Sequence, residues 1–489
     1  MSKTSTRKWW ILAVVTLVAF VTNLDGTIVV VGLPRMVAGL HTTVTTGLWT
    51  LTAYIITSTV FLLPAGRWSD MIGRKRIFLT GLAVFAVATF FCGISPSGSV
   101  LIAFRFVQGV GAALALATAT PIIVSAFPPQ ELGRALGINS TAWVMGSIVG
   151  PVAGGLLVST WGWRWIFFVA IPFALIGVVG SLMVLEEPPV RHQGQSDLAG
   201  AVTFGVGLVA LLLFLSLGQG WGWISARSLG ALAVAVAALL LFWAIEQRSR
   251  QPMFDLGLLK HRHYRSGLGV TILYAIGFFA TTFLLTIYLQ GAVHLSPLDA
   301  GLMLVPLSLP QLVMAPVGGS LADRYGSPML VILGLALLAI AGFWLGHLPV
   351  QFAPWSVILP LLLMSAANGT LWPALTKAVM SSAPRESTGA ASGMFFTFRN
   401  VGMALSLTLA LMIAEVSLPA RLADQIYLGT AGILHPAVEG ALVHATNVGF
   451  WVFVGFYLLA LVTATTLVRP EASTAPKRTY DTGTGSGAS

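Results

Sequence analysis

Uninterrupted apolar stretches of about 20 residues recur along almost the whole chain. A stretch of that length crosses roughly 30 Å of hydrocarbon as a helix. These stretches are continuously apolar instead of alternating over about ten residues, which excludes a transmembrane β-barrel. The chain is therefore expected to be an all-α integral membrane protein. We predict fourteen transmembrane helices, near residues 9–33, 46–65, 77–95, 99–126, 134–158, 164–185, 198–217, 229–246, 267–290, 299–321, 329–346, 354–377, 388–415 and 446–468.

The composition agrees with a protein of the lipid phase. Hydrophobic residues make up 56% of the chain, charged residues 9%, and the mean hydropathy is +0.88, above the range of soluble domains. The 26 Lys and Arg residues concentrate on alternate connections between spans, which predicts a multi-pass protein of the cell (inner) membrane with both termini cytoplasmic. The net charge of +10 is then a topology signal that also attracts anionic membrane lipid, and no nucleic-acid partner is expected.

Several residue patterns are absent from the sequence, and their absence excludes classes of protein chemistry. The single cysteine, Cys92, excludes a disulfide framework and a cysteine metal cluster. No G-x-x-x-x-G-K-[ST] sequence occurs, which excludes a P-loop ATPase. No nucleophile, base and metal constellation appears in the spans, so neither an enzyme nor a cofactor or metal site is expected. The first apolar run continues past Asp25 without a small-residue cleavage site, which indicates an uncleaved first span.

One charged loop occurs twice. GRWSDMIGRKR, from Gly66 to Arg76, follows the second predicted span and has a G-x-x-x-D-x-x-G pattern. GGSLADRYGSP repeats that pattern after the tenth span, at a constant offset of 253 positions. The matched positions are Gly66 and Gly319, Asp70 and Asp323, and Gly73 and Gly326. Internal repeats of this sort are typical of secondary transporters.

The offset predicts two six-helix bundles separated by an insertion. Residues 1–192 form the N-terminal bundle, 193–250 two inserted transmembrane helices, and 251–470 the C-terminal bundle. Residues 471–489, rich in Ser, Thr and Gly, are expected to be a disordered cytoplasmic tail.

The repeated loop is a candidate gate. Gly66 and Gly73 permit a tight turn. Arg74 belongs to the same candidate loop. Asp70 can accept hydrogen bonds from the amino terminus of a neighbouring helix or pair with a basic residue on another helix. A contact of this kind that forms on one side of a transport cycle and breaks on the other is a gate, and Asp323 would repeat it in the second half. The alternative is a topology anchor that never changes.

Four stretches together resemble the major facilitator superfamily, and within it the 14-helix drug:proton antiporters. GRWSDMIGRKR is similar to the superfamily's loop between helices two and three. LDGTIVVVGLP (24–34) looks like the first-helix motif, RFVQGVGAA (105–113) like the fourth-helix motif, and GSIVGPVAGG (146–155) like the fifth-helix antiporter motif. The resemblance implies a major facilitator fold and efflux of drugs in exchange for protons. It also implies that helices one and four face the central cavity of the first half.

Asp25 and Arg105 are the candidate proton-coupling residues. A carboxylate with apolar neighbours inside a span costs at least ~2.5 kcal/mol on insertion scales, and its protonation can change as access to it changes. Counting from the outer ends of spans one and four, Asp25 lies ~12 Å deep and Arg105 ~8 Å deep, so the two can pair. The alternatives are a structural or interfacial aspartate and a static buried ion pair.

The fifth-helix motif places small residues on one face. Gly146, Gly150 and Gly154 recur every four residues, beside Gly155, and allow close approach of another helix. Pro151 removes a backbone donor and bends or loosens the helix. The motif is either a hinge that seals against the second half on the outer side, or simple packing.

The second half contributes candidate cavity residues. A midplane arginine, Arg399, must face a cavity, water or a partner, with Asn368 and Trp372 one span earlier. Tyr274 and Phe278 could form an aromatic wall, although such residues are more often packing. Glu415, at the outer end of span thirteen, is either a second proton site or a wet interfacial carboxylate.

The sequence therefore predicts a proton-coupled antiporter that exports small hydrophobic or cationic compounds by alternating access. A lipid or metabolite exporter on the same fold is the alternative, and a transport-dead sensor is disfavoured by the presence of both Asp25 and Arg105. Some relatives of this architecture work with a periplasmic adaptor protein, which the resemblance adds as a possible partner.

Overall fold

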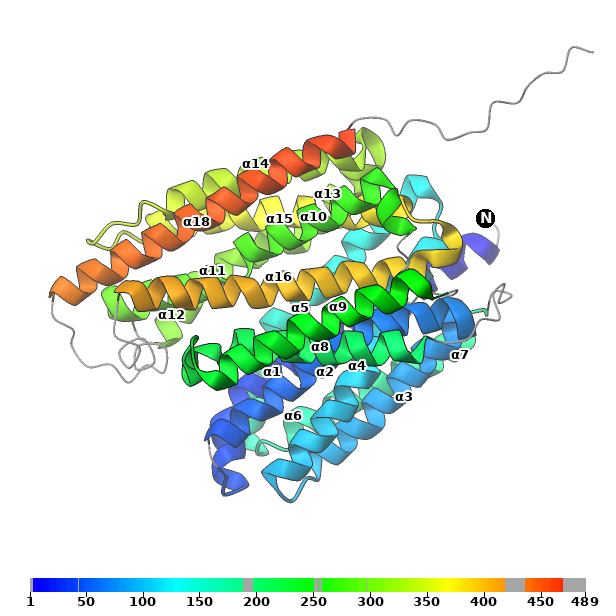
Figure 1. The fold of residues 1–489 in the computed structure, drawn as a ribbon, viewed down its shortest axis with the longest axis horizontal. Coiled ribbons are helices and arrows are strands. Elements are labelled where there is room, and N and C mark those ends of the chain that lie inside the picture. The colour runs from blue at the N-terminus through cyan, green and yellow to red at the C-terminus, as the bar shows by residue number, and fades with distance from the viewer. Residues whose placement is uncertain are drawn as a thin grey trace, which may run out of the picture.

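The computed structural model describes residues 3–42, 44–187, 197–249, 254, 257–295, 297–417 and 436–468. A helix stands at each of the fourteen predicted spans (Figure 1). The first six spans are α1 (Lys3–Gly39), α2 (Val44–Ile72), α3 (Arg74–Gly93), α4 (Gly98–Ala126), α5 (Pro129–Thr160), and α6 (Trp165–Phe168) continued by α7 (Ala170–Val184). The next two are α8 (Leu198–Trp221) and α9 (Ala226–Arg248). The last six are α10 (Arg262–Phe278) continued by α11 (Thr281–Thr286) and a π-helical turn (Ile287–Ala292), α12 (Pro297–Leu304) continued by α13 (Leu309–Tyr325), α14 (Ser327–Leu345), α15 (Trp355–Ser381), α16 (Thr388–Ser417) and α18 (Pro436–Val468).

Length and apolarity explain these helices. Twelve helical segments of the described chain are long and apolar enough to cross a membrane, and α8 adds a shorter apolar core at Ala199–Leu215. Inside a bilayer every backbone N–H and C=O must be satisfied within the segment, which helices achieve. The predicted all-α membrane fold is confirmed.

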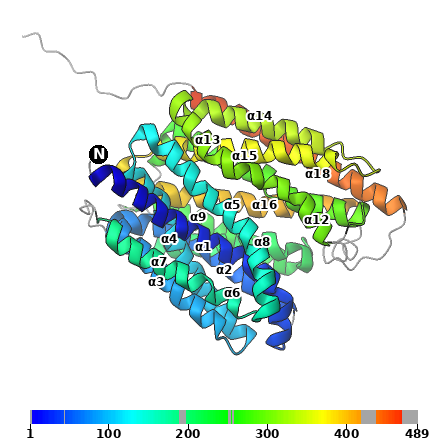
Figure 2. The ribbon, with the colours of Figure 1, turned by 180° about the vertical axis from the view of Figure 1, so that it is seen from behind.

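The helices pack as two groups, and the groups meet at two pairs of helices. In the first group α1 packs on α5, and α2 and α3 on α4; in the second, α13 and α14 pack on α15, and α10 on α18. Between the groups, α5 contacts α13 and α2 contacts α16, an arrangement visible from both sides (Figures 1 and 2). The helix α8 lies against α2 and α16, while α9 lies on α8. The division at residues 192 and 250 stays a prediction, and the proposed tail 471–489 lies outside the described residues.

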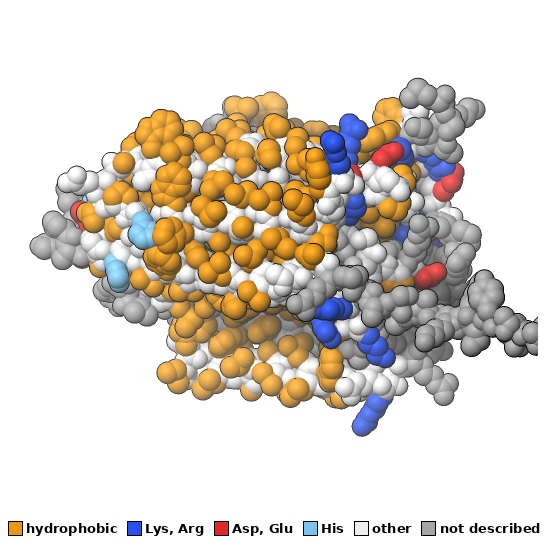
Figure 3. Space-filling model, turned by 90° about the horizontal axis from the view of Figure 1, so that it is seen from above, with side chains coloured by type: hydrophobic (Ala, Val, Ile, Leu, Met, Phe, Trp, Pro, Cys, Tyr) orange, Lys and Arg blue, Asp and Glu red, His pale blue; other side chains and the backbone are white. Residues whose placement is uncertain are grey.

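Charged side chains gather at one end of the molecule. Figure 3 shows an apolar surface over most of the length, with Lys, Arg, Asp and Glu grouped at one end. We call this the basic end; the turn between α2 and α3 and the turn between α13 and α14 lie there. At both turns the residue before the next helix is a glycine with positive φ, 121° at Gly73 and 91° at Gly326. This backbone region favours glycine, which explains why the repeated pattern places glycine there.

Candidate functional site

A buried ion pair connects α1 and α4. Arg105 Nη1 donates to Asp25 Oδ2 at 2.6 Å, and neither residue is exposed. The structure thus brings together the two residues that the sequence singled out for proton coupling. A buried pair of this kind depends on further hydrogen bonds, because removing two charges from water is costly.

Those further hydrogen bonds come from α2 and α4. Gln108 Nε2 donates to Asp25 Oδ1 at 2.9 Å, and Gln108 Oε1 accepts from Arg105 Nη1 at 2.5 Å. Arg105 Nε donates to the Thr50 carbonyl at 2.9 Å, and its guanidinium lies 4.3 Å from the ring centre of Tyr54. Gln108 was missed in the sequence, although it stands one helical turn after Arg105 in the same motif.

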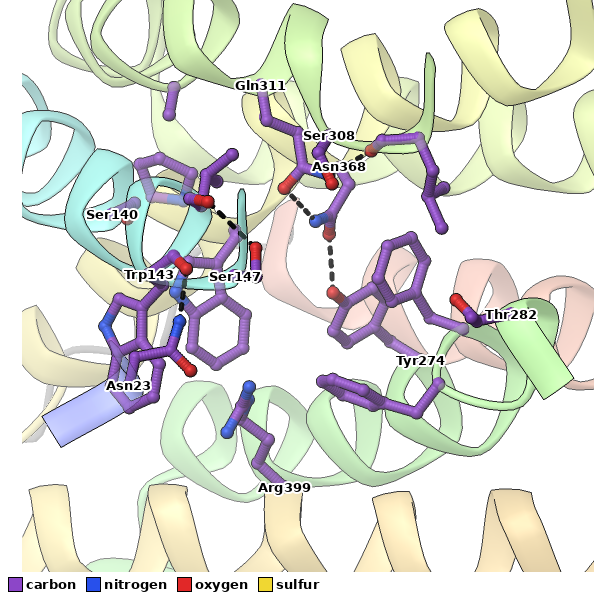
Figure 4. Close-up of a pocket in the computed structure, with 18 residues that line it drawn as sticks. Asn23, Ser140, Trp143, Ser147, Tyr274, Thr282, Ser308, Gln311, Asn368 and Arg399 are labelled. Carbon is purple, nitrogen blue, oxygen red and sulfur yellow. Dashed lines mark hydrogen bonds between the residues drawn. The ribbon is translucent and has the colours of Figure 1, made fainter. Parts of the chain in front are cut away.

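A cavity lies between the two helix groups. Its volume is ≈ 290 Å³ and it is lined from α5 on one side and from α10, α13, α15 and α16 on the other. The predicted residues Asn368, Trp372, Arg399, Tyr274 and Phe278 all line it (Figure 4). The sequence missed its lining from the first half, which is Asn23, Ser140, Trp143, Val144 and Ser147; the α5 members share one helix face, which was the available signal.

Three polar side chains of the cavity bond to one another. Tyr274 donates through its hydroxyl to Asn368 Oδ1 at 2.5 Å, and Asn368 Nδ2 donates to Gln311 Oε1 at 2.8 Å. Gln311 in turn donates to the Leu307 carbonyl at 2.6 Å. This chain of bonds fixes the Tyr274 ring against the cavity.

Arg399 points into the same cavity from α16 (Figure 4). Its guanidinium carbon lies 4.8 Å from the ring centre of Phe279, 5.2 Å from that of Trp372 and 5.4 Å from that of Trp143. Within the described part of the chain it forms no ion pair, and its one hydrogen bond goes to Asn400 Oδ1 at 3.3 Å. The structure therefore favours the cavity interpretation of Arg399 over a fixed structural ion pair.

A break in span nine brings aromatic rings to the cavity. Ala280 N donates to Ser406 Oγ at 2.8 Å, and Ser406 Oγ donates to the Ile276 carbonyl at 2.6 Å. The serine hydroxyl thus replaces the direct helical bond between these backbone groups, which is a recognised cause of a kink. The break follows Phe278 and Phe279, both of which line the cavity.

At the basic end the repeated aspartates make matching contacts. Asp70 accepts from the Gly389 and Ala390 amides at 3.0 and 2.9 Å, at the start of α16. Asp323 accepts from the Gly133 and Arg134 amides at 2.8 and 2.9 Å, near the start of α5. Each aspartate therefore ties its own helix group to the other, in a region where the helix dipole favours negative charge.

The cations beside the two aspartates differ in origin. Arg74 Nη2 lies 3.4 Å from Asp70 Oδ1 and also donates to the Thr388 hydroxyl across the interface. Asp323 Oδ1 is instead 2.5 Å from Lys377 Nζ of α15. Position 327, which matches Arg74 in the repeat, is a serine, so the second loop takes its cation from another helix.

Backbones touch beside both aspartates. A Cβ on Gly66 would overlap the Gly389 carbonyl, and a Cβ on Gly133 would overlap the Gly319 carbonyl. Glycine at these positions permits the two helix groups to meet at the basic end, where the contact is closed.

The glycine face of α5 packs within the first group. A Cβ at Gly146 would approach Asn23 and Leu24, at Gly150 it would overlap Thr27, and at Gly154 it would approach Ile28, all on α1. Nothing lies within 4 Å of a Cβ at Gly155, and Pro151 is exposed. In this structure these three glycines pack against α1, and the hinge and seal against the second half stays a prediction. The side chain of Glu415 lies outside the described residues.

The sequence and the fold both match known proteins. A sequence model of the Major Facilitator Superfamily matches residues 15–407. The tetracenomycin C resistance and export protein of Streptomyces glaucescens is 31% identical over 82% of this chain and 74% of its own. The riboflavin transporter RibZ of Clostridioides difficile (strain 630) is 27% identical over 82% of this chain and 86% of its own. A solved proton:xylose symporter, XylE, has the same fold, with a TM-score of 0.64 and 14% identity over 94% of this chain and 95% of its own.

Proposed function

This chain belongs to the Major Facilitator Superfamily, and from that premise we propose that it is a proton-coupled antiporter exporting amphiphilic drugs or other hydrophobic compounds by alternating access. The observation that carries the proposal is the fully buried Asp25, held by Arg105 and Gln108 inside a span. A proton-coupled transporter needs such a group because a proton must be taken up on one side of the membrane and released on the other. The similarity to a resistance and export protein supports the direction of transport.

Coupling follows from the shared partners of Asp25. When Asp25 is ionised, Arg105 and Gln108 both donate to it. Protonation removes the charge that holds Arg105 to α1 while leaving its bonds to Thr50 and Gln108 on α2 and α4. The proton thus changes how α1 is held against α4, and α1 also packs on α5, which lines the cavity.

The basic end is the proposed cytoplasmic side, as the distribution of basic residues predicts, and the protein is assigned to the cell membrane. The contacts of Asp70 and Asp323 then form the cytoplasmic gate. Opening it requires both aspartates to leave the helix amides that they accept from. Anionic membrane lipid remains a proposed partner because of the net positive charge, and a periplasmic adaptor protein remains one on the resemblance alone.

A metabolite exporter on the same fold is the second candidate. The similarity to a riboflavin transporter supports a cell metabolite as the substrate, since one cavity can serve a cell metabolite or a drug. A drug exporter transports drug-like compounds across the membrane, whereas a metabolite exporter does not.

The test uses purified protein in liposomes, with a pH gradient and a membrane voltage imposed separately. Two fluorescent probes of opposite charge, ethidium and pyrene-1-sulfonate, are followed. Proton-driven movement of either probe supports the proposed function. Movement of neither, with correctly inserted protein, would overturn drug export in favour of the metabolite exporter.

A further inference from the structure

We propose that the cavity is built for planar aromatic molecules that carry an anionic group, and that Arg399 binds that group. The inference rests on the proposed transport function and names its substrate class. It replaces the sequence-based expectation of a cationic substrate.

The charge of the cavity favours an anionic ligand. Arg399 is the charged residue among those that line it, and no Asp or Glu lines it within the described part of the chain. A guanidinium stays protonated in proteins and has five N–H donors. One of these is used, by Asn400 at 3.3 Å. The remaining donors suit a carboxylate, sulfonate or enolate, whose geometry the guanidinium fork matches.

The neighbours of Arg399 explain why its site stays open. Asn368, Gln311 and Tyr274 satisfy one another and do not reach it. The guanidinium also lies over the rings of Phe279, Trp372 and Trp143. Aromatic faces stabilise a cation but accept no conventional hydrogen bond. Arg399 is therefore held in place by these rings, and the donors that do not bond Asn400 are available to a ligand.

The aromatic side chains of the cavity favour a ligand with a planar ring. The Tyr274 ring is nearly parallel to that of Phe278, at 26° with centres 5.5 Å apart, and tilted by 33° from that of Trp372, at 6.1 Å. These rings pack against one another, and Phe278 and Trp372 also line the cavity. A planar aromatic ring in the cavity can pack against them in the offset-stacked or edge-to-face arrangements that aromatic pairs prefer. The Arg399 guanidinium lies 5.2 Å from the ring centre of Trp372, so an aromatic ring packed in the cavity can place an anionic substituent against it.

Binding to the full-length protein in lipid nanodiscs tests the proposal with three probes that share one ring. These are pyrene-1-sulfonate, 1-pyrenemethanol and pyrenyl-trimethylammonium, followed by fluorescence anisotropy with empty nanodiscs as the blank. The sulfonate is expected to bind at least tenfold more tightly than the ammonium. A ratio below ten, or no binding of any probe below 1 mM, would overturn the proposal.

Variants then assign the effect to Arg399. Arg399→Gln should weaken sulfonate binding at least tenfold and change the alcohol less than threefold. Arg399→Lys, which keeps the charge without the fork, should restore part of the loss and shows that the site is intact. Arg164→Gln is the matched control. Arg164 directly precedes α6, donates to the Ser95 carbonyl and does not line the cavity, so the affinities for all three probes should stay unchanged. A sulfonate affinity unchanged in Arg399→Gln would overturn the role of Arg399.

The outcome separates this inference from the proposed function. Proton-driven export of ethidium together with tighter binding of the ammonium would overturn the inference alone. Selective binding of the sulfonate with no proton-driven movement would leave the inference standing and overturn proton coupling.

Discussion

Asp70 and Asp323 lie 253 positions apart, and each accepts two backbone amides from a helix of the opposite group. The amides are themselves matched, since Gly133 and Arg134 correspond to Gly389 and Ala390 at an offset of 256 positions. The closed contact at the basic end is therefore one structural unit used twice. Its duplication explains why the loop pattern recurs in a chain that is otherwise poor in charge.

Asp323→Asn should weaken closure of the basic end. One carboxylate oxygen becomes an amide that cannot accept, and the charge that faces Lys377 is lost. Charge-assisted hydrogen bonds contribute about 1.5–3 kcal/mol each, so the population with an open basic end should rise at least tenfold. Spin-label distances between α5 and α13 measure this. Glu131→Gln, whose partner Lys8 belongs to the same helix group, is the control, and an equal effect there would argue against a gate.

Gly133→Ala should prevent full closure. The added Cβ would overlap the Gly319 carbonyl, a backbone atom that cannot move alone. We expect transport to fall at least tenfold while the protein remains folded. Gly155→Ala on the same helix meets nothing within 4 Å and should keep transport while stabilising the helix by up to about 1 kcal/mol. Transport at the control level in Gly133→Ala would contradict the close approach.

Gln108→Leu should uncouple proton movement from transport. The leucine keeps the volume but removes the donor to Asp25 and the acceptor for Arg105. Losing one partner of a buried polar network costs about 1–3 kcal/mol, so proton-driven transport should fall at least tenfold, while affinity for the probe changes less than threefold. Parallel measurements of binding and transport check the difference. Equal losses in both would make Gln108 a structural residue.

The charge of the substrate should set the voltage dependence of transport. An anion that leaves as one proton enters moves two positive charges inward, each worth about 2.3 kcal/mol per 100 mV. An inside-negative voltage should therefore drive pyrene-1-sulfonate out more strongly than a pH gradient of equal energy per proton. Transport in liposomes clamped with potassium and valinomycin measures this. Insensitivity to voltage would contradict one-for-one exchange of an anion for a proton.

The all-α fold and the depths of Asp25 and Arg105 could be predicted from local rules, whereas the family resemblance supplied that helices one and four face the same cavity. Span length follows from apolar runs, and the depth of two residues in their helices predicts that they can meet. Lys377 could not be predicted as the cation for Asp323, because the repeat gives serine where Arg74 stands. The Ser406 hydroxyl inserted into span nine depends on how two helices pack, and the sequence of span nine alone carries no sign of it. The glycine face of α5 could be recognised, but its partner helix could not.

Proton-driven accumulation and counterflow, measured side by side in liposomes for Asp25→Asn, show whether Asp25 carries the proton. Counterflow exchanges labelled for unlabelled substrate without a proton gradient, so it requires the cavity and the gates but no proton carrier. We predict that Asp25→Asn loses proton-driven accumulation at least a hundredfold and keeps counterflow within about threefold of the wild type. Proton-driven accumulation at the wild-type level in Asp25→Asn would contradict the assignment of Asp25 as the proton carrier.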